Sequence, residues 1–231
     1  CQDSLSNTVR VLVNILSIMV ESVYMGVFVL DLLWQPIFVD ADATTGLNDG
    51  SSWENAYLEL NDAVVAASSC DIKVIWVAEG TYIPIDGTSD PRNTAFEFNC
   101  ETEIFGGFIG TEQSLAERDL SAGYETILSG DIGIPDVKTD NAYSVAIVNA
   151  GYFIMDGFTI TKGFHDQQFS RSGGVTLSPP DTPFGRNFSL HNLTIRNCKF
   201  EDNRSTKGGA IFATEGETTI TQTSLINCTF T

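Results

Sequence analysis

Three aspartates in one loop are the residues of this sequence that most resemble a set of metal ligands. Asp40, Asp42 and Asp49 supply carboxylate oxygens, which are the ligands that calcium prefers. Their spacing differs from that of an EF-hand, which needs a fixed set of twelve-residue loop positions. The loop also contains Gly46 and Gly50, so turn formation is the alternative role for these aspartates. Calcium is the one cofactor that the sequence suggests.

Residues for catalysis are sparse. A polysaccharide-cleaving enzyme needs paired carboxylates, or a basic residue beside calcium-binding aspartates. The two histidines, His165 and His191, read as ordinary loop or surface residues. Arg196 and Lys199 flank Cys198 at outward positions, and no acidic or nucleophilic residue is spaced to work with them. We therefore predict no catalytic residue.

The five cysteines are Cys1, Cys70, Cys100, Cys198 and Cys228. None are spaced as CxxC, which argues against a zinc site. Cys70 and Cys100 flank predicted strands and are candidates for a disulfide. Cys198 and Cys228 are predicted to point inward one turn apart, either as a disulfide or as stacked free thiols.

Four N-x-[ST] triplets suggest a secreted glycoprotein. They lie at Asn187, Asn192, Asn203 and Asn227. The charge is lopsided, with 30 acidic and 12 basic residues and a net charge of −18. Such a surface repels phosphate backbones and argues against nucleic-acid binding. It suits a soluble extracellular exterior.

The first 35 residues form a segment of their own. Residues 9–34 are apolar except for a stripe of polar residues that recurs every three or four positions. A signal sequence, a membrane anchor and an assembly helix that packs against another subunit are the alternatives, and residues 9–15 also alternate as a donated strand would. The residues predicted to make the assembly contact are Val11, Ile15, Ile18, Val27, Leu30 and Leu33.

Residues 36–110 are predicted to form a cap. A short apolar strand at 37–39 is followed by a turn-rich loop, and Ser51 with Glu54 reads as a capping box. Apolar residues then recur at helical spacing from Trp53 to Ala67, and 72–77 reads as a strand. An amphipathic helix between two strands would close one end of an open core.

Residues 111–231 contain short strands separated by Gly, Asn and Asp, with no long helical pattern between them. Parallel strands usually need helical crossovers, whereas a coil that adds one strand to each of several sheets per turn does not. The predicted strands from the end of the cap onward are 104–109, 126–128, 143–148, 153–155, 158–160, 175–177, 193–195, 210–212, 219–221 and 225–226. The sequence thus predicts an all-β, right-handed parallel β-helix, a solenoid.

Internal repetition supports the coil. The segment IRNCKF at 195–200 is echoed by LINCTF at 225–230, and GGV at 173–175 by GGA at 208–210. Because stacked strands lie about 4.8 Å apart, the repeat places equivalent side chains over one another. The predicted ladder consists of Asn197 with Asn227, Cys198 with Cys228 and Phe200 with Phe230.

Several longer motifs resemble those of a known family. FVDADATTGLNDGSSWENAYLELNDAV, IWVAEGTY, FGGFIGTE, AERDL, TILSGDI and MDGFTITKG occur in the order typical of bacterial right-handed parallel β-helix repeat proteins, which are pectin-lyase-like in fold. FEDN at 200–203 and GGAI at 208–211 look like the repeat of chlamydial polymorphic outer-membrane proteins. The resemblance implies the fold and a place at the cell surface, but not an activity.

These observations favour a non-catalytic extracellular structural protein. We expect it to act as a subunit of a self-assembling filament, with other copies of itself as partners, or as a surface adhesin that binds cell-surface glycans. A polysaccharide lyase or hydrolase and a glycan-binding module of a larger surface protein are the alternatives. A membrane is a partner only if the first 35 residues are an anchor.

Overall fold

The computed structural model describes residues 35–69, 73–85, 90–167, 171–178, 190–213 and 220–231. Residues 1–35 form one unit and Pro36–Thr231 form the other. All but one residue of the first unit lie outside the described residues, and so do the predicted assembly positions within it. The other described residues all belong to the second unit.

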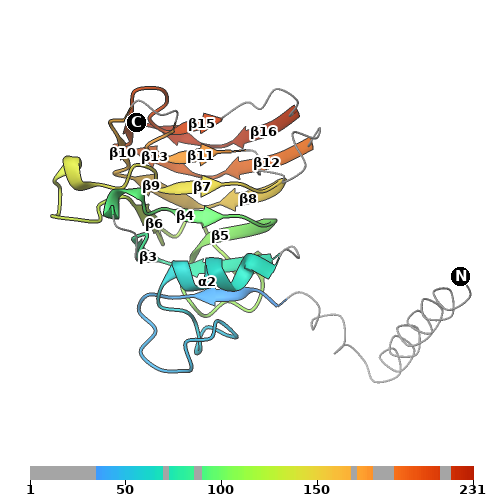
Figure 1. Cartoon of the computed structure of the whole chain (residues 1–231). Helices are drawn as coiled ribbons and strands as arrows, with labels where there is room; N and C mark the ends of the chain where they lie inside the picture. Colours follow the sequence, from blue (N-terminus) through green and yellow to red (C-terminus); the bar gives the residue numbers. More distant parts are fainter. Residues whose placement is uncertain (1–34, 70–72, 86–89, 168–170, 179–189, 214–219) are drawn as a thin grey trace, which may run out of the picture. The chain divides into compact units, whose positions relative to one another are not determined.

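The described residues of this unit form three large parallel sheets and one two-stranded sheet, and Figure 1 shows their strands stacked in layers. The first sheet has the strand order β1 (Ile37–Val39), β2 (Lys73–Ala78), β5 (Thr102–Phe108), β8 (Tyr152–Asp156), β12 (Leu190–Arg196) and β16 (Ile220–Ile226). The second has the order β3 (Gly80–Tyr82), β6 (Thr126–Ser129), β9 (Phe158–Thr161), β13 (Lys199–Glu201) and β17 (Thr229–Phe230). The third contains β4 (Phe96–Phe98), β7 (Ala146–Val148), β11 (Val175–Leu177) and β15 (Ile211–Ala213), and a small pair joins β10 (Phe164–His165) to β14 (Arg204–Ser205).

The chain visits the three sheets in a recurring order. It passes through β2, β3 and β4, then β5, β6 and β7, and the later strands repeat the sequence of first, second and third sheet. Every strand pair formed by the described residues is parallel. The described residues are therefore mostly β-strands in parallel sheets. This agrees with the all-β class predicted from the sequence.

The core consists of side chains that repeat at the same register position from layer to layer. In the first sheet Ile75 pairs with Ile104, which pairs with Met155 and then with Ile195. All four are fully buried. Because side chains alternate across a strand, these positions face the interior while their neighbours face outward. Burial of this apolar surface is the main stabilising term of the unit.

A short helix covers one end of the layers. Helix α2 (Leu60–Ala66) buries Leu60, Ala63 and Val64 and contacts β1 and β4. A short 3-10 helix, η2 (Ala67–Ser69), continues it. Three more such helices lie in loops: η3 (Pro91–Asn93), η4 (Leu115–Glu117) and η5 (Lys138–Asp140).

The predicted start of the capping helix is wrong. The helix begins at Leu60 with Glu59 at its N-cap, so Ser51 and Glu54 do not cap it. Local turn hydrogen bonds hold the preceding loop instead, such as that from the Leu58 amide to Asn48 Oδ1. Trp53 packs edge-on against Phe38, which fixes the loop against the outer face of the first sheet.

Some strand limits also differ from the prediction. The two expected strands 219–221 and 225–226 form one continuous strand, β16, because it pairs along its whole length with β12. Ile109 lies beyond the end of β5. The expected strand 143–148 begins only at Ala146. Short strands such as β10, β14 and β17 have too few residues to show a pattern in sequence.

Candidate functional site

The strands β15, β16 and β17 form one edge of the layers, and Figure 1 shows β15 and β16 at that edge. In the described part of the chain, β16, β17 and β15 each pair with one neighbouring strand only. Leu225 stacks in register on Ile195 and Phe230 on Phe200. Leu225 is 48% exposed and Phe230 is 50% exposed, whereas Ile195 and Phe200 are buried. Within the described residues, the layer of β15, β16 and β17 therefore leaves two core-type side chains half exposed.

The structure brings together the residues of the predicted ladder. Asn227 Nδ2 donates to Asn197 Oδ1 over 2.8 Å, and both residues adopt positive φ at the corner between the first and second sheets. Asparagine tolerates this left-handed conformation better than most residues. The rings of Phe200 and Phe230 are stacked, with centroids 5.2 Å apart and an interplanar angle of 11°. Side-chain contacts as well as backbone hydrogen bonds thus align one layer with the next.

Two of the described cysteines are free thiols, and one is disulfide-bonded. Cys198 is buried and Cys228 partly buried, and both are free thiols. Burial raises the pKa of Cys198 to about 12, so this thiol stays protonated and is a poor nucleophile. Cys100 is disulfide-bonded, whereas Cys70 lies outside the described residues and its pairing with Cys100 stays a prediction.

A buried charge cluster at the same corner was missed by the sequence analysis. Asp156 Oδ2 accepts from Arg118 Nη2 over 2.9 Å and from Arg196 Nε over 2.7 Å, and Asp156 Oδ1 accepts from Asn197 Nδ2 over 2.8 Å. Asp156 is 1% exposed. The expectation that Arg196 has no acidic partner is therefore wrong. The expectation is also wrong for Lys199, which pairs with Glu201 at 2.6 Å.

The environment of Asp156 favours its ionised form. Burial opposes ionisation, but the hydrogen bond from Asn197 and the charges and hydrogen bonds of Arg118 and Arg196 outweigh it. They hold the pKa of Asp156 below its ordinary value of 3.8. Arg118 also donates to the Gly106 carbonyl over 3.0 Å and so ties a loop to the corner. The cluster therefore links successive layers through their side chains.

The predicted calcium ligands act as turn residues in the structure. Asp40 Oδ1 accepts from the Asp42 amide over 2.9 Å, and Asp49 Oδ1 accepts from the Ser51 amide over 3.0 Å. Within the described ranges no group of three or more His, Cys, Asp or Glu side chains could hold a metal ion. Calcium binding by this loop stays a prediction.

The four candidate glycosylation sites differ in whether the side-chain nitrogen already donates a hydrogen bond. Asn187 lies outside the described residues. Asn192 is exposed in β12, and its side chain makes no hydrogen bond within the described part of the chain. Asn203 Nδ2 donates to the Ile160 carbonyl over 2.7 Å, and Asn227 Nδ2 belongs to the asparagine ladder. Each of these two nitrogens already donates to a neighbouring layer, so a glycan attached there would crowd that contact.

We expect Asn192 to carry a glycan when the chain is secreted from a eukaryotic host, and Asn203 and Asn227 to be unmodified in the folded fraction. Peptide mass spectrometry before and after enzymatic release of N-glycans measures occupancy at each position. Asn192→Gln is the control and should remove the mass shift. Full occupancy at Asn203 in protein with an unchanged melting temperature would contradict this expectation.

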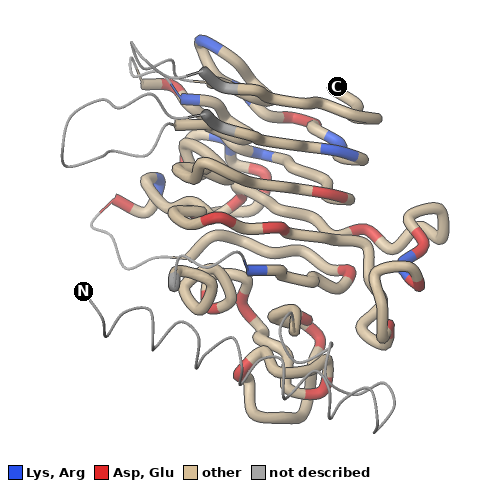
Figure 2. The backbone as a smooth tube through the Cα atoms, turned by 90° about the vertical axis from the view of Figure 1, so that its right-hand side faces the viewer, with Lys and Arg blue, Asp and Glu red and all other residues tan. Residues whose placement is uncertain are grey.

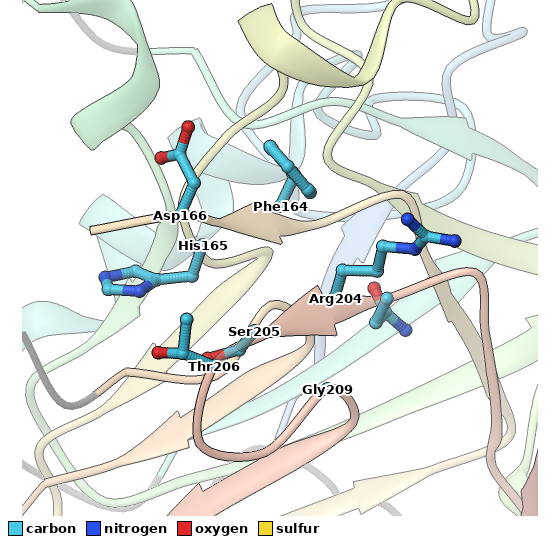
Figure 3. Close-up of a pocket in the computed structure, with 8 residues that line it drawn as sticks. Phe164, His165, Asp166, Arg204, Ser205, Thr206 and Gly209 are labelled. Atoms are coloured by element: carbon cyan, nitrogen blue, oxygen red, sulfur yellow. The ribbon is translucent and has the colours of Figure 1, made fainter. Parts of the chain in front are cut away.

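A cleft lies beside the small strand pair β10–β14 (Figure 3). Its volume is about 380 Å³. Residues from both strands and from the turn after β14 line it: Phe164, His165, Asp166, Asn203, Arg204, Ser205, Thr206 and Gly209. In Figure 3 the His165 ring and Thr206 lie toward one end of the strand pair, and Phe164 and Arg204 toward the other.

The expectation that His165 is an ordinary surface residue is wrong, because it is 3% exposed. Its ring packs edge-on against Tyr143, with centroids 5.6 Å apart, and its Nδ1 is buried without a hydrogen-bond partner in the described residues. Burial and the nearby charge of Arg171 lower the pKa of His165, so the ring is neutral at pH 7. His191 lies in β12 but is not among the residues whose side chains are described, so the expectation for it stays a prediction.

No helix in the described ranges is both long and apolar enough to cross a membrane. The candidate anchor at residues 9–34 lies outside those ranges and stays a prediction. Comparison of the whole chain with family models, curated proteins and solved structures finds no match, so its resemblance to β-helix repeat proteins remains a prediction from the sequence motifs.

Proposed function

We propose that residues 36–231 form a capped right-handed parallel β-helix and that the protein is a non-catalytic extracellular structural protein. It joins other copies of itself through the edge made by β15, β16 and β17. The observation that carries this proposal is the pair of half-exposed core-type positions, Leu225 and Phe230, on strands that pair on one side only within the described residues.

The recurring order of the three sheets supports the coil. A chain that returns to the same sheet after each visit to the other two adds one parallel strand per turn to every sheet. Equivalent positions then stack, as Ile104, Met155 and Ile195 do. The family resemblance of the sequence motifs points to the same coil and to its right-handed sense.

The chemistry of the edge supports association. An unpaired strand presents N–H and C=O groups that can pair with another strand, and exposed apolar side chains beside them favour such pairing. At this edge β16 offers seven residues and lacks the lysine and proline residues that usually protect an edge strand. A contact between this edge and a different surface of the next copy repeats head to tail and gives a filament.

We assign the contact on the next copy to residues 9–34. This segment is apolar over most of its surface, and Val9, Val11, Val13 and Ile15 alternate as a strand would. An apolar strand or helix laid on Leu225 and Phe230 would remove both side chains from water.

The proposal predicts that a charge facing the core at the edge blocks association. Leu225→Lys places an ammonium group where the next layer would pack, and its effect on the monomer is limited because Leu225 is already half exposed. We expect the wild-type chain to form assemblies that grow with concentration and the variant to stay monomeric. Light scattering coupled to size-exclusion chromatography measures both, and negative-stain microscopy shows whether the assemblies are filaments.

Two further variants complete this test. Ile134→Lys adds the same charge at a 66% exposed loop position away from the edge and should leave assembly unchanged. The double variant Ile15→Asp with Ile18→Asp tests the leading segment and should prevent assembly as Leu225→Lys does. A wild-type chain that stays monomeric at all concentrations, or assemblies that persist in Leu225→Lys, would refute the proposal.

A further inference from the structure

The asparagine ladder, Asn197 with Asn227, has a direction and an open end. We propose that this ladder continues from one copy to the next, with the side-chain amide of Asn14 in the second copy donating to Asn227 Oδ1. The inference rests on the association through β16 proposed above and adds to it the register of the donated strand.

Asp156 sets the direction of the ladder. Its ionised carboxylate can only accept hydrogen bonds, so Asn197 turns its Nδ2 toward Asp156, over 2.8 Å. The Oδ1 of Asn197 then faces the next layer, where it accepts from Asn227 Nδ2 over 2.8 Å. Asn197 and Asn227 follow paired residues and have nearly equal φ, 52° and 51°, and each donates its Nδ2 to the layer before it. Asn227 Oδ1 therefore faces away from Asn197, and the ladder ends on a carbonyl oxygen.

This end of the ladder is open within the described residues. Asn227 is exposed, and none of the described groups donates to its Oδ1. Figure 2 shows the layers stacked one on another up to the layer that carries the C-terminus. The strands β16 and β17 of that layer contain no charged residue. A strand added here therefore meets a hydrogen-bond acceptor and apolar side chains.

The corner also restricts which residue can occupy it in an added layer. Three successive layers place a residue with positive φ there, between 51° and 85°: Gly157, Asn197 and Asn227. Glycine and asparagine adopt this left-handed conformation most readily. Residues 9–34 contain one of each, Asn14 and Gly26. Asn14 is the one that supplies a side-chain N–H to the open carbonyl oxygen.

The residues that precede Asn14 fit the same register. With Asn14 placed over Asn227, the two preceding residues are apolar in both strands. They are Leu12 and Val13 in the donated strand and Leu225 and Ile226 in β16. The two in β16 are 48% and 53% exposed, so the added strand removes apolar surface from water. Because a slip by one residue turns every side chain to the other face, one register has to satisfy both the ladder and the apolar pairs.

Disulfide trapping in the assembled full chain tests this register. Ile15 is predicted to lie over the free thiol of Cys228, at a layer spacing of about 4.8 Å that a disulfide can span. We expect Ile15→Cys to give disulfide-linked dimers after assembly and mild oxidation, with position 15 joined to Cys228 in peptide mass spectrometry. Val27→Cys is the matched control, since Val27 takes that place only if Gly26 occupies the corner. Both variants also carry Cys1→Ser, so that Cys1 cannot form the link.

Asn14→Asp tests the donor itself. Aspartate keeps the size of the side chain and tolerates the left-handed corner, but it presents a carboxylate oxygen to the Asn227 carbonyl in place of an N–H. We expect the concentration needed for assembly to rise at least about tenfold, because two acceptors then face each other without a proton between them. Asn7→Asp adds the same charge away from the corner and should leave this concentration nearly unchanged.

The outcomes separate this inference from the association on which it rests. Assembly without the link between position 15 and Cys228, or with the link from position 27 instead, would overturn the register while leaving the association intact. Equal effects of Asn14→Asp and Asn7→Asp would show a general charge effect and would also overturn it. A wild-type chain that stays monomeric would refute the association and this inference together.

Discussion

Asp156→Ala is expected to lower the free energy of unfolding by about 3–5 kcal/mol, because it leaves the guanidinium of Arg118 buried without its carboxylate. The Arg118 side chain is 8% exposed and lies 2.9 Å from Asp156. Arg196 and Asn197 lose their shared acceptor in the same variant. Urea unfolding followed by circular dichroism measures the change through the shift of the midpoint at constant slope.

Two further variants separate burial from charge. Asp156→Asn keeps the size of the side chain but removes its charge, so it should also be strongly destabilising. Lys138→Gln breaks an ion pair with Asp202 in which both side chains are more than 40% exposed, at 43% and 47%. That change should cost less than about 1 kcal/mol, as exposed pairs usually do. Equal effects of Asp156→Ala and Lys138→Gln would contradict the role that we assign to the cluster.

The same cluster predicts how stability depends on pH. The pKa of Asp156 is lower in the folded protein than its ordinary value of 3.8. Its contribution is therefore complete above the unfolded-state pKa and is lost as the pH falls through the folded-state pKa. The stability difference between wild type and Asp156→Ala should be largest near neutral pH and shrink below about pH 4. A difference that stays constant down to pH 2 would contradict this assignment.

Phe200→Ala is expected to destabilise the protein by about 3–5 kcal/mol, as large-to-small changes of buried aromatic residues do. Phe200 is 1% exposed and lies in register between Ile160 and Phe230. The matched control is Phe230→Ala, which removes the same ring from a position that is 50% exposed. We expect this control to cost only about 1 kcal/mol in dilute protein, because half of the ring is already in water.

The Phe230 control also reports on association. If another copy covers the edge, the cost of Phe230→Ala should increase with protein concentration, since binding to the folded state adds to its stability. Thermal unfolding at several concentrations measures this dependence. A cost for Phe230→Ala that is as large as that for Phe200→Ala in dilute protein would show that the ring is already covered in the monomer.

The sequence was most informative where the repeat is visible. The match between residues 195–200 and 225–230 anticipates that Asn227 stacks on Asn197 and Phe230 on Phe200, because a constant spacing fixes the register of parallel layers. The helical spacing of Leu60, Ala63 and Val64 likewise anticipates the buried face of α2. Both features depend on periodicity within a short stretch of chain.

Other features depend on contacts that periodicity cannot reveal. Arg118 and Asp156 are 38 residues apart in sequence, and Arg196 is 40 residues from Asp156. They meet only because a loop from one layer reaches the corner of the next. The cleft also joins distant segments, because β10 and β14 come from successive layers. The burial of His165 follows from this pairing and has no signal in the local sequence.

Electron cryomicroscopy of the wild-type chain at a concentration where it associates tests the central claim most directly. The account predicts density for residues 9–34 of a second copy along β16, covering Leu225 and Phe230, with the same contact repeated from copy to copy. Single copies with an uncovered edge, or assemblies joined through another surface, would contradict it.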